Sequence, residues 1–326
     1  MSISSFLTKK FLKSLFFPAH NRGKALPKGL IRLLKKQPGF WDLPELPEIG
    51  SPLSNSGLIH DAQISISKKV NTKKCFFGVN GASGLIQSGI IAMANPGEYI
   101  LMPRNVHISV IKACALQNII PIFFDIEFSR ITGHYMPITK KWFTNVFNNI
   151  DFDNSKIAGV ILVSPYYQGY ATDLEPLIKI CHLHNLPVLV DEAHGSYFLF
   201  CENFNLPKSA LRSKADLVVH SLHKSLNGLT QTAIIWHNGN LIEENKLIKS
   251  INLLQTTSPN SLLLSSCEES IKDWLNKDNL NKYKKRISEA KSIFKELIKE
   301  GIPLVKTQDP TKICLLYTSP SPRDRG

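Results

Sequence analysis

Lys224 ends an apolar run, ADLVVHSLHKS (residues 215–225), where a charged amine leaves water only at a cost in free energy. An amine in such a position can have a depressed pKa and can attack a carbonyl carbon to form a Schiff base. Ser221 and His223 flank it with further polar groups. A solvated surface lysine is the simpler alternative. We expect Lys224 to be a reactive residue if the fold brings other functional groups next to it.

Asp191 is the second candidate, because it directly follows the apolar run PVLV in the segment DEAHG (residues 191–195). A carboxylate at the end of a buried strand needs a partner, and it can keep a heterocyclic ring nitrogen protonated through a charge-assisted hydrogen bond. Ala193 points the same way along an extended chain and is small enough to lie under a flat ring. The alternative is an aspartate that caps a helix.

The segment NGASG (residues 80–84) predicts an anion site. Its small residues open a helix, and the start of a helix offers unpaired N–H groups together with the positive end of the helix dipole. Small residues let a phosphate approach the backbone, and the Ser83 hydroxyl can add a hydrogen bond. An ordinary N-cap turn is the alternative. A lysine, an aspartate and a phosphate cradle are the three groups that pyridoxal 5'-phosphate (PLP) needs.

Other residues remain open between functional and structural interpretations. His107 follows a predicted strand and is either a ligand-facing residue or a capping histidine. Arg104 fits a structural ion pair as well as a ligand contact. Tyr166 and Tyr167 fit either the wall of a site or the core.

Seven short apolar runs, separated mostly by helix-length stretches, indicate that these residues lie close together. Such alternation predicts an α/β fold, a three-layer sandwich in which helices cover both faces of a mostly parallel seven-stranded sheet. Ligands bind beyond the carboxyl ends of strands in such sheets, and the polar segments above follow the runs directly. The runs are CFFGV (75–79), YILMP (99–103), IIPIFF (119–124), GVILVSP (159–165), PVLVDEA (187–193), LVVHSL (217–222) and TAIIWH (232–237).

Three regions are expected along the chain. Residues 1–62 hold a basic N-terminal helix, favoured over a targeting peptide, and a Pro-rich extended arm. Residues 63–275 form the cofactor-binding domain. Residues 276–326 begin a C-terminal domain that is largely missing, and the stretch 269–302 reads as one long amphipathic helix. Residues 313–326 are polar and Pro-rich near their end, and we expect them to reflect a truncated reading frame or a foreign tail.

Composition excludes several classes. The 326 residues are 43% hydrophobic, which predicts a globular chain, and no apolar run approaches the roughly 18 residues of a membrane span. The net charge of +13 is spread along the chain rather than gathered in a patch, so we expect no nucleic-acid partner. Six scattered cysteines predict a reducing compartment, the cytoplasm. The segment CHLH (181–184) lacks a second ligand pair, so we expect no metal.

The sequence resembles the major domain of the Orn/Lys/Arg decarboxylase family, within fold type I of PLP-dependent enzymes. The similarity runs from about residue 18 to about residue 275. DEAHG and HSLHKSLNGLTQTA carry it most specifically, and other segments support it in the expected order. These are PAHNRG, NGASGLIQ, PRNVHISV, SPYYQGYATDLEPL and LLQTTSPNSLLL.

The resemblance implies a role for each matching position. Lys224 would form the Schiff base with PLP, Asp191 would pair with the ring nitrogen, and His107 would stack on the ring. His194 would lie near the ring oxygen or the substrate and, with Lys224 and His107, belong to the catalytic set. The implied cofactor-binding residues are Ala82, Ser83, Gly84, His107, Asp191, His194, Ser221, His223 and Lys224.

The implied activity is decarboxylation of arginine, lysine or ornithine, which releases carbon dioxide and a polyamine-type amine. The family also implies a homodimer or higher homo-oligomer, with residues 256–260 serving the site across the interface. An aminotransferase, an aldolase-type lyase and a fragment that only binds cofactor are the alternatives. Substrate choice stays open, because Tyr197 stands where many relatives have a second histidine and Ala82 and Gly84 replace hydroxyl residues.

Overall fold

A single seven-stranded sheet lies at the centre of the computed structural model, which describes residue 7, residues 17–150 and residues 156–316. The sheet has the order β1-β9-β8-β7-β6-β2-β3. Strand β9 runs antiparallel to β1 and β8, and every other neighbouring pair is parallel. Each strand comes from one of the seven apolar runs. The strands are β1 (Lys74–Gly78), β2 (Tyr99–Pro103), β3 (Ile120–Phe124), β6 (Ile157–Val163), β7 (Val188–Asp191), β8 (Leu217–Ser221) and β9 (Ala233–His237).

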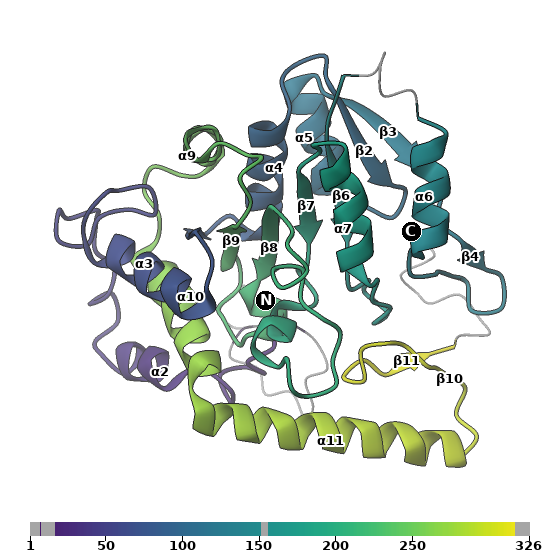
Figure 1. Ribbon diagram of the computed structural model, residues 1–326. Coiled ribbons are helices and arrows are strands. Elements are labelled where there is room, and N and C mark those ends of the chain that lie inside the picture. The colour runs from purple at the N-terminus through teal and green to yellow at the C-terminus, as the bar shows by residue number, and fades with distance from the viewer. Residues whose placement is uncertain (1–6, 8–16, 151–155, 317–326) are drawn as a thin grey trace.

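Helices cover both faces of the sheet, so the predicted three-layer α/β sandwich is confirmed (Figure 1). The two faces have separate apolar cores, because successive strand side chains point to opposite sides. One face carries α4 (Gly81–Met93), α5 (Ile108–Gln117) and α9 (Glu244–Leu254). The other carries α3 (Leu58–Val70), α6 (Lys140–Asn148), α7 (Leu174–Leu183) and α10 (Ser261–Leu275).

Short elements decorate this frame at the edge where the parallel strands end. The helical ones are α2 (Lys28–Leu34), the 3-10 helix η1 (Ser196–Phe200) and α8 (Leu222–Ser225). Two hairpins add β4 (Phe128–Ser129) with β5 (His134–Tyr135), and β10 (Leu304–Val305) with β11 (Cys314–Leu315). The predicted domain limit at residue 62 falls within α3, and the domain division stays a prediction. Most of the predicted N-terminal helix and residues 317–326 of the predicted tail lie outside the described residues.

One helix prediction is wrong. The stretch 269–302 is not a single helix, because α10 ends at Leu275 and α11 (Lys277–Lys299) begins after Asn276. The Asn276 side chain accepts hydrogen bonds from the N–H groups of Asp278 and Asn279, which caps the new helix. Amphipathic periodicity continues across this break, so periodicity alone did not reveal it.

All six cysteines are free thiols, and five of them are buried. No helix among the described residues is both long and apolar enough to cross a lipid bilayer. Within residues 17–150 and 156–316, His, Cys, Asp and Glu side chains form no group of three that could hold a metal ion. The segment CHLH contributes Cys181 to the core and pairs His182 with Asp216.

Candidate active site

A cavity of about 650 Å³ opens at the carboxyl ends of the parallel strands. Its walls come from the start of α4 and from the segments that follow β2, β6, β7 and β8. It therefore lies where open α/β sheets bind ligands. All but one of the predicted site residues line it, the exception being Gly84. The lining includes Ala82, Ser83, His107, Asp191, Ala193, His194, Ser221, His223 and Lys224.

Lys224 reaches the cavity from α8, the single turn that directly follows β8. Its Nζ lies 3.1 Å from His194 Nε2. Burial lowers the pKa of Lys224, although the nearby charge of Asp191 opposes the shift. Burial, followed by the charge of Lys224, lowers the pKa of His194 to about 3. His194 is thus neutral near pH 7, and its Nε2 can accept a hydrogen bond from the Lys224 amino group.

Asp191 ends β7 and presents its carboxylate to the same cavity, although the residue is only 7% exposed. Its Oδ1 accepts the Ala193 N–H at 3.1 Å, and no other hydrogen bond to this carboxylate is found among the described residues. Burial raises the pKa of Asp191, and the charges of Lys224 and His107 oppose this shift. A buried carboxylate with one oxygen that accepts no hydrogen bond is suited to bind a cationic N–H donor.

The predicted anion site is the first turn of α4, which begins at Gly81. Gly81 has φ +69°, a conformation that favours glycine, and its N–H donates to the Gln231 carbonyl. Ala82 and Ser83 face the cavity, where the first N–H groups of the helix lack intrahelical acceptors. Gly84 instead faces the loop after α9: an added Cβ would lie 2.8 Å from Gln255 Nε2. Close packing explains this glycine.

Ser221 and His223 line the same cavity as that turn. The Ser221 hydroxyl lies 3.2 Å from His223 Nδ1, and Ser221 is fully buried at the end of β8. Burial lowers the pKa of His223. The N-terminal segment closes this side, because the Ala19 N–H donates to the His223 carbonyl and the Phe17 ring lies edge-on to His194.

His107 is the N-cap of α5, and its Nδ1 accepts the Ser109 N–H at 3.2 Å. The capping interpretation is confirmed, and His107 also lines the cavity, so its contact with a ligand stays a prediction. Arg104 is absent from the lining and forms an ion pair with Asp125 at 2.6 Å. The contacts therefore support a structural ion pair for Arg104 rather than a ligand contact.

Several lining residues had no sequence signal strong enough to select them. Tyr135 comes from β5, a strand of two residues that no periodicity could identify. Asn105 lines the cavity with a buried Oδ1 that lacks a hydrogen-bond partner among the described residues. Tyr166 and Tyr167, left open above, both line the cavity. Tyr166 is 4% exposed and also packs in a small core cluster, whereas Tyr167 is 63% exposed.

The model of one protein family matches residues 18–315: Orn/Lys/Arg decarboxylase, major domain. The chain belongs to the Orn/Lys/Arg decarboxylase family. It is similar to the arginine decarboxylase of Bacillus subtilis, with 30% identity over 251 residues that make up 77% of this chain and 50% of the relative. It is also similar to lysine decarboxylase LdcA of Pseudomonas aeruginosa, with 24% identity over 53% of this chain and 20% of the relative. The chain thus spans about half the length of the arginine decarboxylases that it matches.

Solved structures of low identity show the same fold. The constitutive lysine decarboxylase of E. coli superposes with a TM-score of 0.71 at 18% identity, covering 91% of this chain and 44% of that one. Lysine decarboxylase LdcF of Francisella novicida gives 0.69 at 22% identity, covering 90% and 42%. Serine palmitoyltransferase of Sphingomonas wittichii gives 0.61 at 17% identity, covering 80% and 62%. The fold is that of fold type I PLP-dependent enzymes, as predicted.

Proposed function

We propose that this chain binds PLP through Lys224 and is the cofactor-binding part of a decarboxylase of arginine, lysine or ornithine. One observation carries the proposal: the Lys224 amine, the buried Asp191 carboxylate and the first turn of α4 face a single cavity. Family membership supports decarboxylation over transamination or aldol cleavage. Matched solved structures include one described as "SPT with PLP".

Each group of the cavity has a task in this proposal. The Lys224 amine would hold the cofactor by condensing with its aldehyde, with water as the leaving group, and His194, whose Nε2 lies 3.1 Å from the amine, would accept a proton from it. Asp191 would accept a hydrogen bond from the ring N–H, His107 would stack on the ring, and α4 with Ser83, Ser221 and His223 would hold the phosphate. When bound, PLP accepts the electron pair of the bond that breaks at the substrate Cα. Lys224 or His194 then returns a proton to that carbon.

The site is proposed to work in a homodimer or larger homo-oligomer in the cytoplasm. Residues 256–260 are mostly exposed and line two smaller pockets rather than the candidate-site cavity. This position suits a segment that serves the site of a second copy. Light scattering of the purified chain tests the assembly.

Absorption spectroscopy tests the proposal. Wild-type chain mixed with PLP should show the visible band of lysine-bound PLP, and Lys224→Ala should lose it. Lys112→Ala is the matched control, because Lys112 lies exposed on α5 away from the cavity, and it should keep the band. A band that survives in Lys224→Ala would overturn the assignment of Lys224.

A second measurement separates decarboxylation from its alternatives. Arginine, lysine and ornithine are supplied in turn to PLP-loaded chain, and carbon dioxide, amine and keto acid are quantified. Carbon dioxide with equimolar amine is expected. Keto-acid formation would identify an aminotransferase, and the band without any product would identify a chain that only binds the cofactor.

A further inference from the structure

Three buried side chains form a hydrogen-bonded chain beneath the candidate site, on the face of the sheet that α7 and α10 cover. Glu192 Oε2 lies 2.7 Å from His220 Nε2, and Trp236 Nε1 lies 3.0 Å from His220 Nδ1. Glu192 is 1% exposed, and His220 and Trp236 are fully buried. None of the three lines the cavity, so the proposed chemistry leaves this cluster unexplained.

The hydrogen-bond pattern fixes where the protons are. An indole N–H can only donate, so His220 Nδ1 accepts and Nε2 carries the ring proton. His220 Nε2 therefore donates to Glu192. The other Glu192 oxygen accepts the Ala210 N–H at 2.9 Å, so a proton on this carboxyl group would find no acceptor. The pattern fits an ionised Glu192 beside a neutral His220.

The cluster lies directly behind the groups that face the cavity. Successive side chains of a strand point to opposite faces, so Glu192 points away from the side that Asp191 faces. His220 precedes Ser221 on β8 and bears the same relation to it. Trp236 belongs to β9, the antiparallel neighbour of β8. The hydrogen bonds thus tie β7, β8 and β9 together at the point where the site residues begin.

We propose that Glu192, His220 and Trp236 are positioning residues that hold Asp191 in register with Ser221 and Lys224 for PLP. This inference rests on the proposed PLP function. Asp191 and Lys224 come from neighbouring strands and must grip opposite ends of one rigid cofactor. A relative shift of β7 and β8 by about 1 Å would weaken both contacts at once, because the cofactor cannot stretch to follow them.

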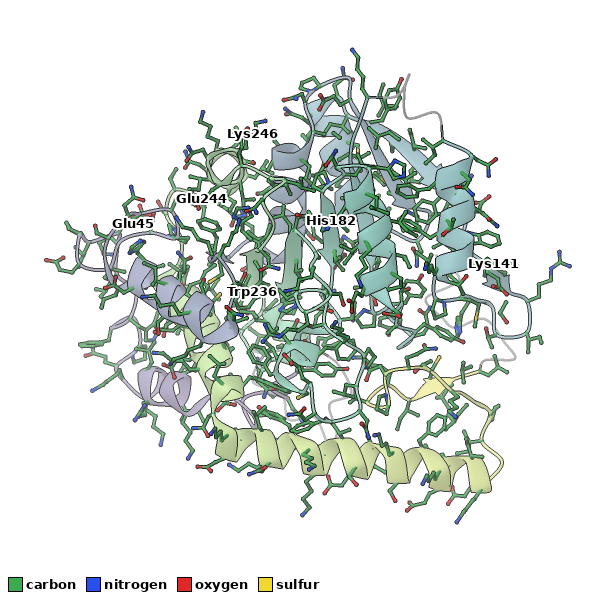
Figure 2. The ribbon with its side chains drawn as sticks, viewed as in Figure 1. Glu45, Lys141, His182, Trp236, Glu244 and Lys246 are labelled. Carbon is green, nitrogen blue, oxygen red and sulfur yellow. The ribbon has the colours of Figure 1, made fainter. Side chains whose placement is uncertain are left out.

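The other end of β8 offers a matched control. Asp216 is 1% exposed, and its Oδ2 lies 2.8 Å from His182 Nε2 and accepts the Val188 N–H at 2.8 Å. Each carboxylate therefore accepts one imidazole N–H and one backbone N–H. His220 is four residue steps along the extended chain from Asp216, a distance of about 13 Å. In Figure 2, His182 lies on α7 and Trp236 lies in the part of the sheet where β8 and β9 run.

The variants Glu192→Gln and Asp216→Asn test the inference in the full chain, by PLP titration and urea unfolding. Both amides replace an acceptor oxygen by a donor and should lower stability. Only Glu192→Gln should weaken PLP binding, by about tenfold or more, and shift the absorption band of bound PLP. Asp216→Asn should leave the affinity within about twofold. Trp236→Phe breaks only the indole bond and should act in the same direction if Glu192→Gln fails to fold.

The outcomes separate this inference from the proposed function. A normal PLP band and affinity in both wild type and Glu192→Gln would overturn the positioning role alone. Equal loss of affinity in Glu192→Gln and Asp216→Asn would also overturn it, because general loss of stability would then explain both. Absence of PLP binding in the wild-type chain would overturn the proposed function and this inference with it.

Discussion

Replacing Tyr197 by phenylalanine should loosen the segment of residues 304–316. This segment packs against the end of β6 and the residues that follow it. The Tyr197 hydroxyl donates to Asp309 Oδ2 and lies 2.7 Å from Thr311 Oγ1. Asp309 is fully buried, and its Oδ1 is held by the N–H and hydroxyl of Thr311. Burial and Asp309 both raise the pKa of Tyr197, so the phenol stays protonated and remains a donor.

The size of the effect follows from these contacts. Tyr197→Phe leaves Asp309 Oδ2, a buried charged oxygen, without its donor. A hydrogen bond to a charged group contributes about 1.5–3 kcal/mol. Asp309 keeps its bonds from Thr311, so the loss is that of one bond rather than of the whole anchor. Local opening of residues 304–316 should become roughly ten- to a hundredfold more frequent.

Hydrogen exchange measured by mass spectrometry over residues 303–316 reads out this opening. The Asp309 N–H, which donates to the Gly169 carbonyl at 3.0 Å, is the informative amide. Tyr170→Phe is the control: this tyrosine packs in the same cluster as Val305, but its hydroxyl makes no hydrogen bond among the described residues. Equal exchange rates in the two variants would refute the anchoring role of Tyr197.

Two further outcomes concern stability. Gly89→Ala should lower the free energy of unfolding in urea by about 1–3 kcal/mol, because a Cβ there would lie 2.3 Å from Leu189 Cδ1 where α4 meets the sheet. The pKa of His194 falls from 6.5 to about 3 on folding, so the unfolded chain binds more protons between these values and stability decreases as pH drops through that range. His194→Gln should flatten this part of the pH profile of the urea midpoint.

The sheet was predictable because its strands, apart from the edge strand β3, are mostly buried on both faces. Each strand then reads as a continuous apolar run, and all seven runs became strands of one sheet. The order of the strands and the antiparallel direction of β9 were not predictable, since the apolar run TAIIWH has no feature that sets its direction. Direction depends on the connection between β8 and β9, which passes through α8 and the loop that follows it.

The site residues that lie at or just after the end of a strand were predictable. Asp191, His107 and Lys224 each follow a strand closely, so the rule on carboxyl ends brought them together correctly. Tyr135 could not be found in this way, because it comes from the two-residue strand β5 and only the folded chain brings it to the cavity.

In the motif HSLHK, the junction between β8 and α8 places two histidines, His220 and His223, in different environments. Up to Ser221 the chain is extended, so side chains alternate: His220 faces the core beneath the sheet and Ser221 faces the cavity. After Ser221 the chain turns into α8, and His223 and Lys224 both face the cavity. A register slip of one residue in β8 would exchange the two faces and place a buried histidine where Ser221 now lies. The role proposed for Lys224 therefore depends on the register of β8, a strand none of whose apolar residues lines the cavity.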